Sequence, residues 1–323
     1  MNNKKNFKFL RSFILFLIFP FCVLAQDYPN KPIRIIVPFA PGGGVDFMAR
    51  VISQKLQILN GQQVIVENKG GSGGVIGAEY GVRSLPDGYT LLMISSTYTV
   101  SPSLYKLSFN PINDISPIGL IAKGPFIISA HPSLPIKNTK DLILLSKNKP
   151  GMINYATSGS GSGVHLATEL FLYMANIKMN HVPYKGTGPA LVDTISGQTQ
   201  LIFGSVATTL PIIKSGHLRA IAVTSMSRIQ SDLDIPTVSE SGLIGYSAFV
   251  WQGLIGPKGL QKNIVDKLNS NILNISLQKE MVDKMKSEGL SIDNSTPENF
   301  LNLIKKEIKV WQEIVNIAKV KIN

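Results

Sequence analysis

The sequence predicts an α/β fold in which mainly parallel sheets, flanked by helices, form two lobes. Short apolar runs rich in Ile, Val and Tyr alternate with helical patterns along most of the 323 residues. Two of these runs end in glycine-rich turns that lead directly into amphipathic helix patterns, at residues 33–46 and 153–165. Ligands of such sheets bind outside the carboxyl ends of the strands, so we expect a cleft at these two turns.

We expect strands where the apolar runs are short and bounded by turn residues. These strands cover residues 33–37, 64–67, 90–94, 118–121, 126–130, 153–156, 179–182, 201–203, 220–224 and 254–255. Apolar residues recur at three- and four-residue spacing over 45–59 and 166–174, which predicts amphipathic helices. The segment 304–322 shows the same spacing and is expected to form a long helix that packs back on a core.

The chain is expected to cross between the lobes twice. The first crossing is Lys123-Gly124-Pro125, which joins two apolar runs, and the second follows residues 242–245. Lobe 1 is therefore expected to be discontinuous, with residues 26–123 and 247–323, while lobe 2 contains residues 124–246.

The first 25 residues are expected to be a secretory signal peptide that is cleaved after Ala25. Four basic residues, Lys4, Lys5, Lys8 and Arg11, precede and enter an apolar stretch at 13–19. This stretch is shorter than the roughly 20 residues that a membrane span needs. Cys22 would leave with the signal, so the exported chain would contain no disulfide, and we expect it in the periplasm.

The basic charge of the chain fits a small anionic ligand and simple solubility equally well. Removal of the four basic residues with the signal lowers the formal net charge from +12 to +8. The remaining charge is spread along the chain, without the Lys/Arg-rich runs and interleaved aromatic residues of nucleic-acid surfaces. We therefore expect no nucleic-acid partner. We also expect a monomer.

The first glycine turn, Gly42-Gly43-Gly44, is a candidate anion site because free N–H groups at a helix start carry a partial positive charge. We expect the glycine N–H groups, with the backbone of Phe39 and Ala40, to contact the ligand. Asp46 is expected to cap the helix and shape the loop rather than to bind directly, since a carboxylate repels a bound carboxylate.

The second glycine turn, at 158–163, adds serine hydroxyl donors to its backbone N–H groups. Its spacing is not a nucleotide-binding fingerprint. A third cluster, at 70–74, either lines the cleft or forms a tight turn, and the turn is favoured. Hydroxyls at 95–97 could reach the ligand, and Phe249 and Trp251 could wall the pocket, although aromatic side chains are more often simply buried.

We expect neither a metal, nor a cofactor, nor a catalytic site. The histidines are His131, His165, His181 and His217, and none pairs with another at metal-ligand spacing. Ser162, His165 and Glu169 could suggest a nucleophile relay, but neighbours three or four apart on one helix more often cap and pack. A secreted hydrolase using Ser162 and His165 remains an alternative that ester turnover would test.

Taken together, the motifs resemble the Bug family (TctC-type) of extracytoplasmic solute-binding receptors of tripartite tricarboxylate transporters. The resemblance covers essentially the whole mature chain. The matching stretches lie at 28–34, 37–46 with Arg50, 66–68, 86–91, 165–167, 181–186, 188–190 with Asp193, and 218–224.

The resemblance implies a type II periplasmic-binding-protein-like fold whose lobes close on a small carboxylate. It implies a ligand site formed by Phe39, Ala40, Gly43, Gly44, Asp46, Thr97, Ser158, Ser162, His165 and Asp193. Val45 departs from the family, where many relatives have a hydroxyl residue before the Asp, so one side-chain hydrogen bond is lost. The implied partners are membrane permease subunits, and the alternative is a sensor that presents its ligand to a membrane two-component histidine kinase.

Overall fold

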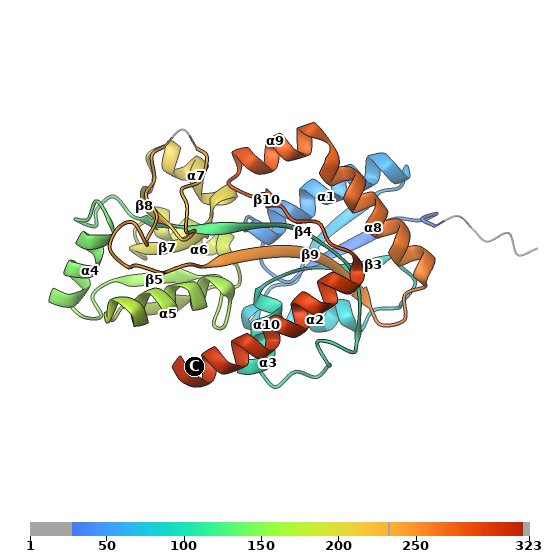
Figure 1. The fold of residues 1–323 in the computed structure, drawn as a ribbon, viewed down its shortest axis with the longest axis horizontal. Coiled ribbons are helices and arrows are strands. Elements are labelled where there is room, and N and C mark those ends of the chain that lie inside the picture. Colours follow the sequence, from blue (N-terminus) through green and yellow to red (C-terminus); the bar gives the residue numbers. More distant parts are fainter. Residues whose placement is uncertain (1–27, 232, 319–323) are drawn as a thin grey trace, which may run out of the picture.

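The computed structural model describes residues 28–231 and 233–318, which form two α/β lobes side by side (Figure 1). The expected signal peptide lies outside the described residues. Three parallel strands begin lobe 1: β1 (Ile33–Val37), β2 (Val64–Asn68) and β3 (Thr90–Ser95). Lobe 1 also contains α1 (Gly44–Asn60), a short 3-10 turn (Ser72–Gly74), α2 (Val75–Val82), α3 (Thr97–Leu104), α8 (Lys262–Leu277), α9 (Lys279–Ser287), β10 (Ser291–Ile292) and α10 (Pro297–Ala318).

Lobe 2 repeats this design with its own parallel strands. Its elements are α4 (Thr139–Asn148), β5 (Asn154–Thr157), α5 (Gly163–Ala175), β6 (Asn180–Pro183), α6 (Thr187–Ile195), β7 (Leu201–Ser205), α7 (Val206–Lys214) and β8 (Arg219–Val223). Strand β5 pairs in parallel with both β6 and β7. The order of strands through both lobes is β2-β1-β3-β9-β4-β7-β5-β6.

Two long antiparallel strands, β4 (Ile115–Ala130) and β9 (Phe249–Pro257), join the lobes. The part of β4 at 115–125 pairs with β9, whereas the part at 126–130 pairs with β7 and β8. The sequence predicted two strands separated at Lys123-Gly124-Pro125, but the structure has one continuous strand, because pairing with β9 supports the backbone through this stretch. The resulting sheet is mixed rather than uniformly parallel. The residues at which the lobes divide stay a prediction.

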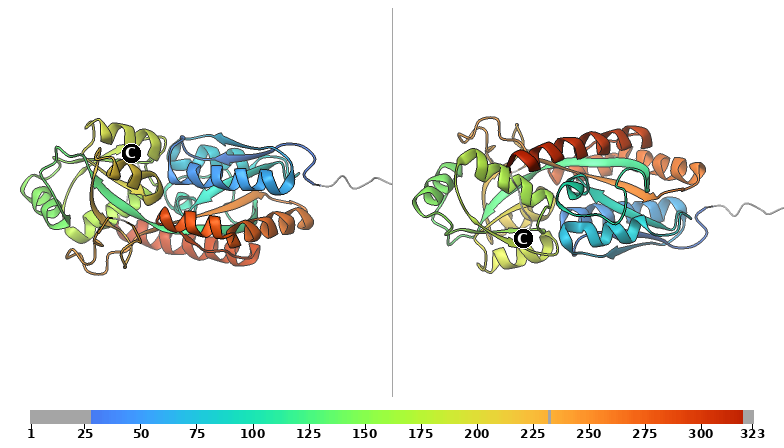
Figure 2. Two further views of the ribbon diagram at one scale, coloured as in Figure 1. Left: turned by 90° about the horizontal axis from the view of Figure 1, so that it is seen from above. Right: turned by 90° about the horizontal axis from the view of Figure 1, so that it is seen from below.

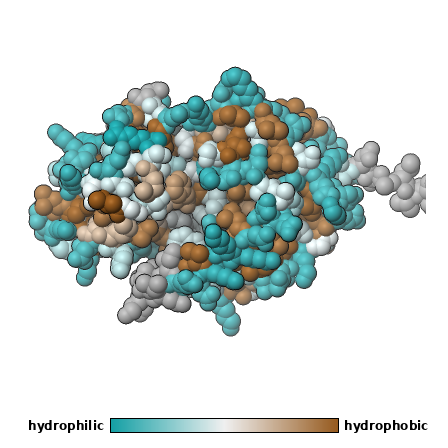
Figure 3. Space-filling model, viewed as in Figure 1, coloured by the Kyte–Doolittle hydropathy of each residue, from teal (hydrophilic) through white to brown (hydrophobic). Residues whose placement is uncertain are grey.

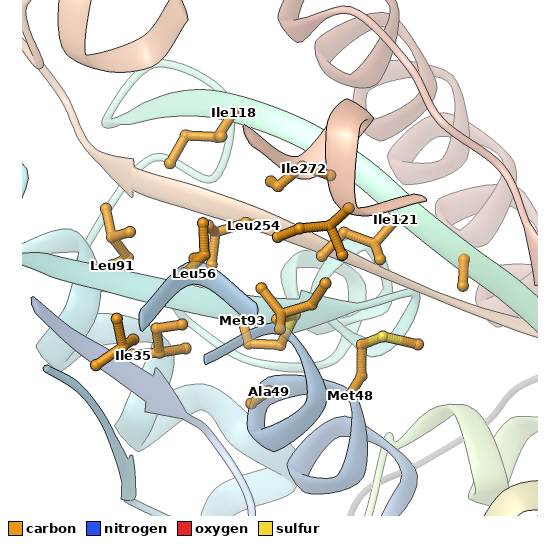
Figure 4. Close-up of a cluster of buried hydrophobic side chains, with 14 of the residues drawn as sticks. Ile35, Met48, Ala49, Leu56, Leu91, Met93, Ile118, Ile121, Leu254 and Ile272 are labelled. Carbon is orange, nitrogen blue, oxygen red and sulfur yellow. The ribbon is translucent and has the colours of Figure 1, made fainter. Parts of the chain in front are cut away.

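Both faces of the lobe 1 sheet are buried, which explains why its strands are continuous apolar runs. Successive residues point to opposite faces, so Ile35, Leu91 and Met93 pack in one core cluster while Ile36 and Leu92 pack in another. In Figure 4 the first cluster lies between α1, α8 and the sheet, with Leu56 and Ile272 contributed by these two helices.

The second lobe 1 cluster is covered by α10. Ile304 from this helix is fully buried there, as the apolar spacing predicted, and so is Phe300, which precedes the predicted segment. The last part of the predicted helix, residues 319–322, lies outside the described residues. The views in Figure 2 show α10 along one side of the molecule, reaching from lobe 1 toward lobe 2. Lobe 2 has a separate core around Tyr155, Phe171 and Phe203. Each lobe therefore has its own core, and β4 and β9 connect them.

The described surface is mixed in polarity, and Figure 3 shows hydrophilic and apolar residues interspersed on one face. Among the described helices, none is both long and apolar enough to cross a membrane.

Candidate functional site

Asp46 fixes the first glycine loop without capping the first helical N–H groups. Its Oδ2 accepts hydrogen bonds from the Gly42 N–H at 3.0 Å and from Arg50 Nε at 3.0 Å, and its Oδ1 accepts one from Asn68 Nδ2 at 2.9 Å. Burial alone would raise the pKa of this carboxyl, but the Arg50, Gly42 and Asn68 donors together hold its pKa below the usual value. Since its oxygens are already bonded, Asp46 shapes the loop.

The first N–H groups of α1 consequently stay available. Gly43 is the N-cap residue, and no side chain caps the helix there. The N–H groups of the first turn have no partner within the helix, and the Phe47 N–H is the first that bonds back, to the Gly43 carbonyl at 2.9 Å. This end of α1 therefore presents donors and a partial positive charge.

The second glycine loop is fixed by α5 and by lobe 1. Ser162 caps α5, because its Oγ accepts a hydrogen bond from the His165 backbone N–H at 3.2 Å. The Gly161 N–H donates to His165 Nδ1 at 3.1 Å. The Gly163 N–H donates across the lobe boundary to Thr97 Oγ1 at 2.9 Å. These three hydrogen bonds fix the conformation of the loop.

Two stacked, neutral histidine rings lie next to this loop. The rings of His165 and His181 lie 4.1 Å apart and nearly parallel, and Tyr155 stacks on the far side of His181. Burial, followed by the neighbouring His181, lowers the pKa of His165 to about 3, and burial lowers that of His181 to about 4. His165 is therefore a neutral acceptor for the Gly161 N–H.

The geometry does not assemble the nucleophile relay that the sequence left open. Ser162 Oγ bonds to the backbone of His165, whereas the His165 ring bonds to Gly161 and stacks on His181. Within residues 28–231 and 233–318, no cluster of His, Cys, Asp and Glu is suited to a metal ion.

A cavity of about 40 Å³ lies between the lobes where the two glycine loops meet. At roughly 10–15 Å³ each, this is room for about three water molecules. Fifteen residues line it: Phe39, Gly43, Gly44, Val45, Asp46, Ser95, Thr97, Phe126, Ser158, Gly163, Val164, Thr187, Ser205, Val250 and Gln252. No Lys, Arg or His is among these described residues.

Five helices start at this cavity. Its lining includes the first residues of α1 (Gly44), α3 (Thr97), α5 (Gly163) and α6 (Thr187), and the N-cap residue of α7 (Ser205). Each helix start carries a partial charge of roughly +0.5. The cavity is consequently positive without any cationic side chain.

Six of the ten expected ligand-binding residues line the cavity, namely Phe39, Gly43, Gly44, Asp46, Thr97 and Ser158. Ser162 and His165 lie outside the lining and hold the second loop. Ala40 lines a separate open hollow of about 620 Å³. Asp193 lies on α6, where it accepts a hydrogen bond from the Tyr184 hydroxyl at 2.6 Å.

Sequence reasoning missed Thr187, Ser205 and Gln252. Ser95, whose hydroxyl was a candidate, does line the cavity, and so does the apolar side chain of Val45. On β9 the cavity residues are Val250 and Gln252, while Trp251 between them is buried on the opposite face and donates to Glu307 at 2.9 Å. The alternation of a strand was the signal that could have identified Gln252.

The lobes contact each other closely around this cavity. The Ala40 N–H donates to the Lys185 carbonyl at 2.9 Å, and the Tyr105 hydroxyl donates to the Ser160 carbonyl at 2.8 Å. A β-carbon added at Gly73 would lie 2.3 Å from the Ser160 oxygen, so the third glycine cluster forms a turn and also lies at the lobe contact. The structure is therefore a closed form.

Comparisons with known proteins agree with this architecture. Residues 48–320 match the family model described as "Tripartite tricarboxylate transporter family receptor". BugT of Bordetella pertussis is 35% identical over 296 residues, which cover 91% of each chain. The solved structure of the periplasmic binding protein BugD is 34% identical, covers 91% of this chain and 99% of its own, and superposes with a TM-score of 0.87. The structure of R. palustris Rpa4515 with adipate is 30% identical, with coverage of 91% and 99% and a TM-score of 0.88.

Proposed function

Because the chain belongs to the family of tripartite tricarboxylate transporter receptors, we propose that it is a periplasmic binding protein for a small carboxylate. In this proposal the exported protein captures its ligand between the two lobes and delivers it, in the closed form, to the permease of a tripartite transporter. The protein acts as a receptor and carries out no catalysis.

The observation that carries the carboxylate assignment is the convergence of five helix starts on one small cavity. Anions at a helix start are typically favoured by 0.3–1 kcal/mol, and by about 2 kcal/mol in partly buried geometries. Backbone N–H groups and hydroxyls supply directed hydrogen bonds. A cation would be repelled here, because the Asp46 carboxylate is already bonded by three donors. The adipate bound by the relative Rpa4515 supports the same class of ligand.

We assign direct contact with the ligand to the predicted residues in the lining: Phe39, Gly43, Gly44, Thr97 and Ser158. Asp46, Ser162 and His165 position the two loops. Ala40 contributes through its hydrogen bond to Lys185, and Asp193 contributes by holding Tyr184 next to that residue.

Contacts from both lobes supply the free energy of closure. A ligand shifts the equilibrium between open and closed forms only if it binds the closed form more tightly. Because α1 and α3 belong to one lobe while α5, α6 and α7 belong to the other, a carboxylate in the cavity bonds fully only when the lobes are closed.

A thermal-shift screen of residues 26–323 against mono-, di- and tricarboxylates, with mass spectrometry of any acid that copurifies, tests the proposal. A ligand at 100 times its dissociation constant stabilises the fold by about 2.7 kcal/mol. A selective shift supports the receptor assignment, whereas no shift and no bound acid contradict it.

Delivery to a permease is tested separately, by uptake of the identified ligand into cells with and without the receptor gene. Loss of uptake supports delivery. Unchanged uptake together with lost induction of ligand-dependent genes would instead assign the protein to a sensor kinase.

A further inference from the structure

We propose that Glu307 on α10 is a positioning residue that holds the start of α3 and strand β9 at the cavity as a protonated acid, and that capture of an anionic ligand is accompanied by uptake of a proton at this carboxyl. This inference rests on the proposed capture of a carboxylate. It concerns a residue that lies behind the cavity and is not part of its lining.

Glu307 bonds to two of the elements that form the cavity. Its Oε2 accepts a hydrogen bond from Trp251 Nε1 at 2.9 Å and lies 2.9 Å from the Thr99 hydroxyl oxygen. Trp251 lies on β9 between two residues that line the cavity. Thr99 lies in the first turn of α3, which begins at the cavity residue Thr97. Glu307 therefore fixes α3 and β9 relative to each other from the side away from the ligand.

The number of protons in this network indicates that the carboxyl is protonated. The Ser96 carbonyl oxygen lies 2.7 Å from Thr99 Oγ1, and this hydroxyl oxygen lies 2.9 Å from Glu307 Oε2. A hydroxyl has one proton to donate, and so has the indole N–H of Trp251, whereas a carbonyl and an ionised carboxylate only accept. Two protons serve only two of the three contacts. A proton on Glu307 supplies the third, because the acid then donates to Thr99 while Thr99 donates to Ser96.

The surroundings of Glu307 also favour the neutral form. Burial raises the pKa of its carboxyl, and this effect exceeds that of the hydrogen bonds and of the Lys306 charge, which lower the pKa. Of the elements packed against it, β9 has no titratable residue, and α3 has only Tyr98, whose hydroxyl is bonded to a backbone carbonyl. Strand β4 has only Lys123, which is paired with Asp293 at 2.7 Å.

A bound anion favours the protonated acid further. The partial positive charge at the start of α3 stabilises an ionised carboxylate at Glu307 in the ligand-free protein. An anionic ligand at the same helix start offsets this charge and repels a second negative group, so it raises the pKa of Glu307. Because such coupling is reciprocal, the proton strengthens ligand binding by the same factor. The affinity for the ligand should therefore fall as the pH rises.

The test is calorimetric titration of the native protein and of Glu307→Gln with malate, adipate and any acid that the thermal-shift screen identifies, at pH 6.5 and 8.5 in buffers of different ionisation enthalpy. These acids are ionised throughout this range, so a proton that is taken up binds to the protein. In the native protein we expect net proton uptake and an affinity at least three-fold higher at pH 6.5 than at pH 8.5. Glutamine is neutral at every pH and keeps one of the hydrogen bonds. In Glu307→Gln we therefore expect no proton uptake and affinities at the two pH values that agree within two-fold.

The matched control is Glu313→Gln, which removes the same charge from an exposed position on α10 and should keep the native pH dependence. The positioning role is tested by Glu307→Leu, which removes both hydrogen bonds. At pH 6.5 this variant should bind at least five-fold more weakly than Glu307→Gln, because Trp251 and Thr99 both lose their partner.

Equal affinity of the native protein at both pH values without proton uptake, or a pH dependence that persists in Glu307→Gln, overturns the proposed proton uptake but leaves carboxylate capture intact. Native affinity in Glu307→Leu overturns the positioning role.

Failure of every carboxylate to bind the native protein overturns the proposed function itself, and Glu307 is then tested by urea unfolding without ligand. The folded chain holds this proton to a higher pH than the unfolded chain does. The urea midpoint of the native protein relative to that of Glu307→Gln should therefore fall as the pH rises from about 4.5 toward neutral, and a constant difference overturns the protonation of Glu307.

Discussion

Substitution of Gly188 by alanine should hold the receptor open while leaving both lobes folded. Gly188 lies in the first turn of α6 in lobe 2, and a β-carbon there would lie 1.9 Å from the Pro41 carbonyl oxygen of lobe 1. Within a helix, alanine is favoured over glycine by roughly 0.5–1 kcal/mol, so lobe 2 itself should not be destabilised. The collision exists only in the closed form.

The size of the expected loss of affinity follows from the hydrogen bonds that form between the lobes when they close. Relief of a 1.9 Å approach requires the lobes to separate by more than 1 Å, to reach an ordinary contact of roughly 3.5 Å. That displacement breaks the hydrogen bonds from Ala40 to Lys185 and from Gly163 to Thr97. At about 1 kcal/mol each, their loss disfavours closure by about 2 kcal/mol. Apparent affinity falls with the population of the closed form, here by about 30-fold.

The assay is calorimetric affinity together with small-angle scattering at a ligand concentration that just closes the native protein. We expect Gly188→Ala to bind about 30-fold more weakly and to keep its larger, open radius at this concentration. The matched control is Val192→Ala on the same helix, where the side chain is 63% exposed, and it should bind and close like the native protein. Native affinity and native closure in Gly188→Ala would refute the assignment of this contact to the closed form.

Three further predictions concern the loops around the cavity. Asp46→Ala should lower the free energy of unfolding by about 1–3 kcal/mol and weaken ligand binding, because the Gly42, Arg50 and Asn68 donors lose their acceptor. Chemical denaturation measures the first effect, and calorimetry measures the second. Thr97→Val should leave the lobes folded but weaken binding by up to about ten-fold, since the Gly163 N–H loses its partner across the lobes. Stability should also fall as the pH falls from about 6.5 to about 4, because the unfolded chain protonates His165 and His181 at their ordinary pKa while the folded chain keeps them neutral.

Each of these has a result that contradicts it. Unchanged binding in Asp46→Ala would show that the first loop keeps its shape without the carboxylate. Stronger binding in Thr97→Val would mean that the hydroxyl competes with the ligand for Gly163. As the pH falls from 6.5 to 4, each neutral histidine lowers the free energy of unfolding by up to about 1.4 kcal/mol per pH unit. If the free energy of unfolding of a His165→Gln variant depends on pH over this range as in the native protein, His165 is not a source of the loss.

The sequence identified the parts of the fold that local patterns determine. Parallel strands such as β1 and β5 appear within a residue or two of their expected positions, because buried strands read as short apolar runs. The continuity of β4 through Lys123-Gly124-Pro125 was not predicted, since it depends on pairing with β9, which lies far along the chain. Two-residue β10 is too short to leave a pattern.

The candidate site shows the same difference between features set by local sequence and features set by contacts between distant residues. The glycine loops were found because their residues act locally, through backbone conformation and free N–H groups. Thr187 and Ser205 were missed because they reach the cavity only when lobe 2 closes against Gly43 and Gly44. Gln252 was missed because the face that a strand residue occupies is set by its register with its neighbours.

The most direct test of the account is a crystal structure of residues 26–323 with the bound acid. We predict that the carboxylate lies between the two glycine loops, with its oxygens roughly 2.7–3.2 Å from backbone N–H groups at the starts of α1 and α5. A ligand bound outside this cavity, or one held there by a neutral or cationic group, would contradict the claim that the converging helix starts form an anion site.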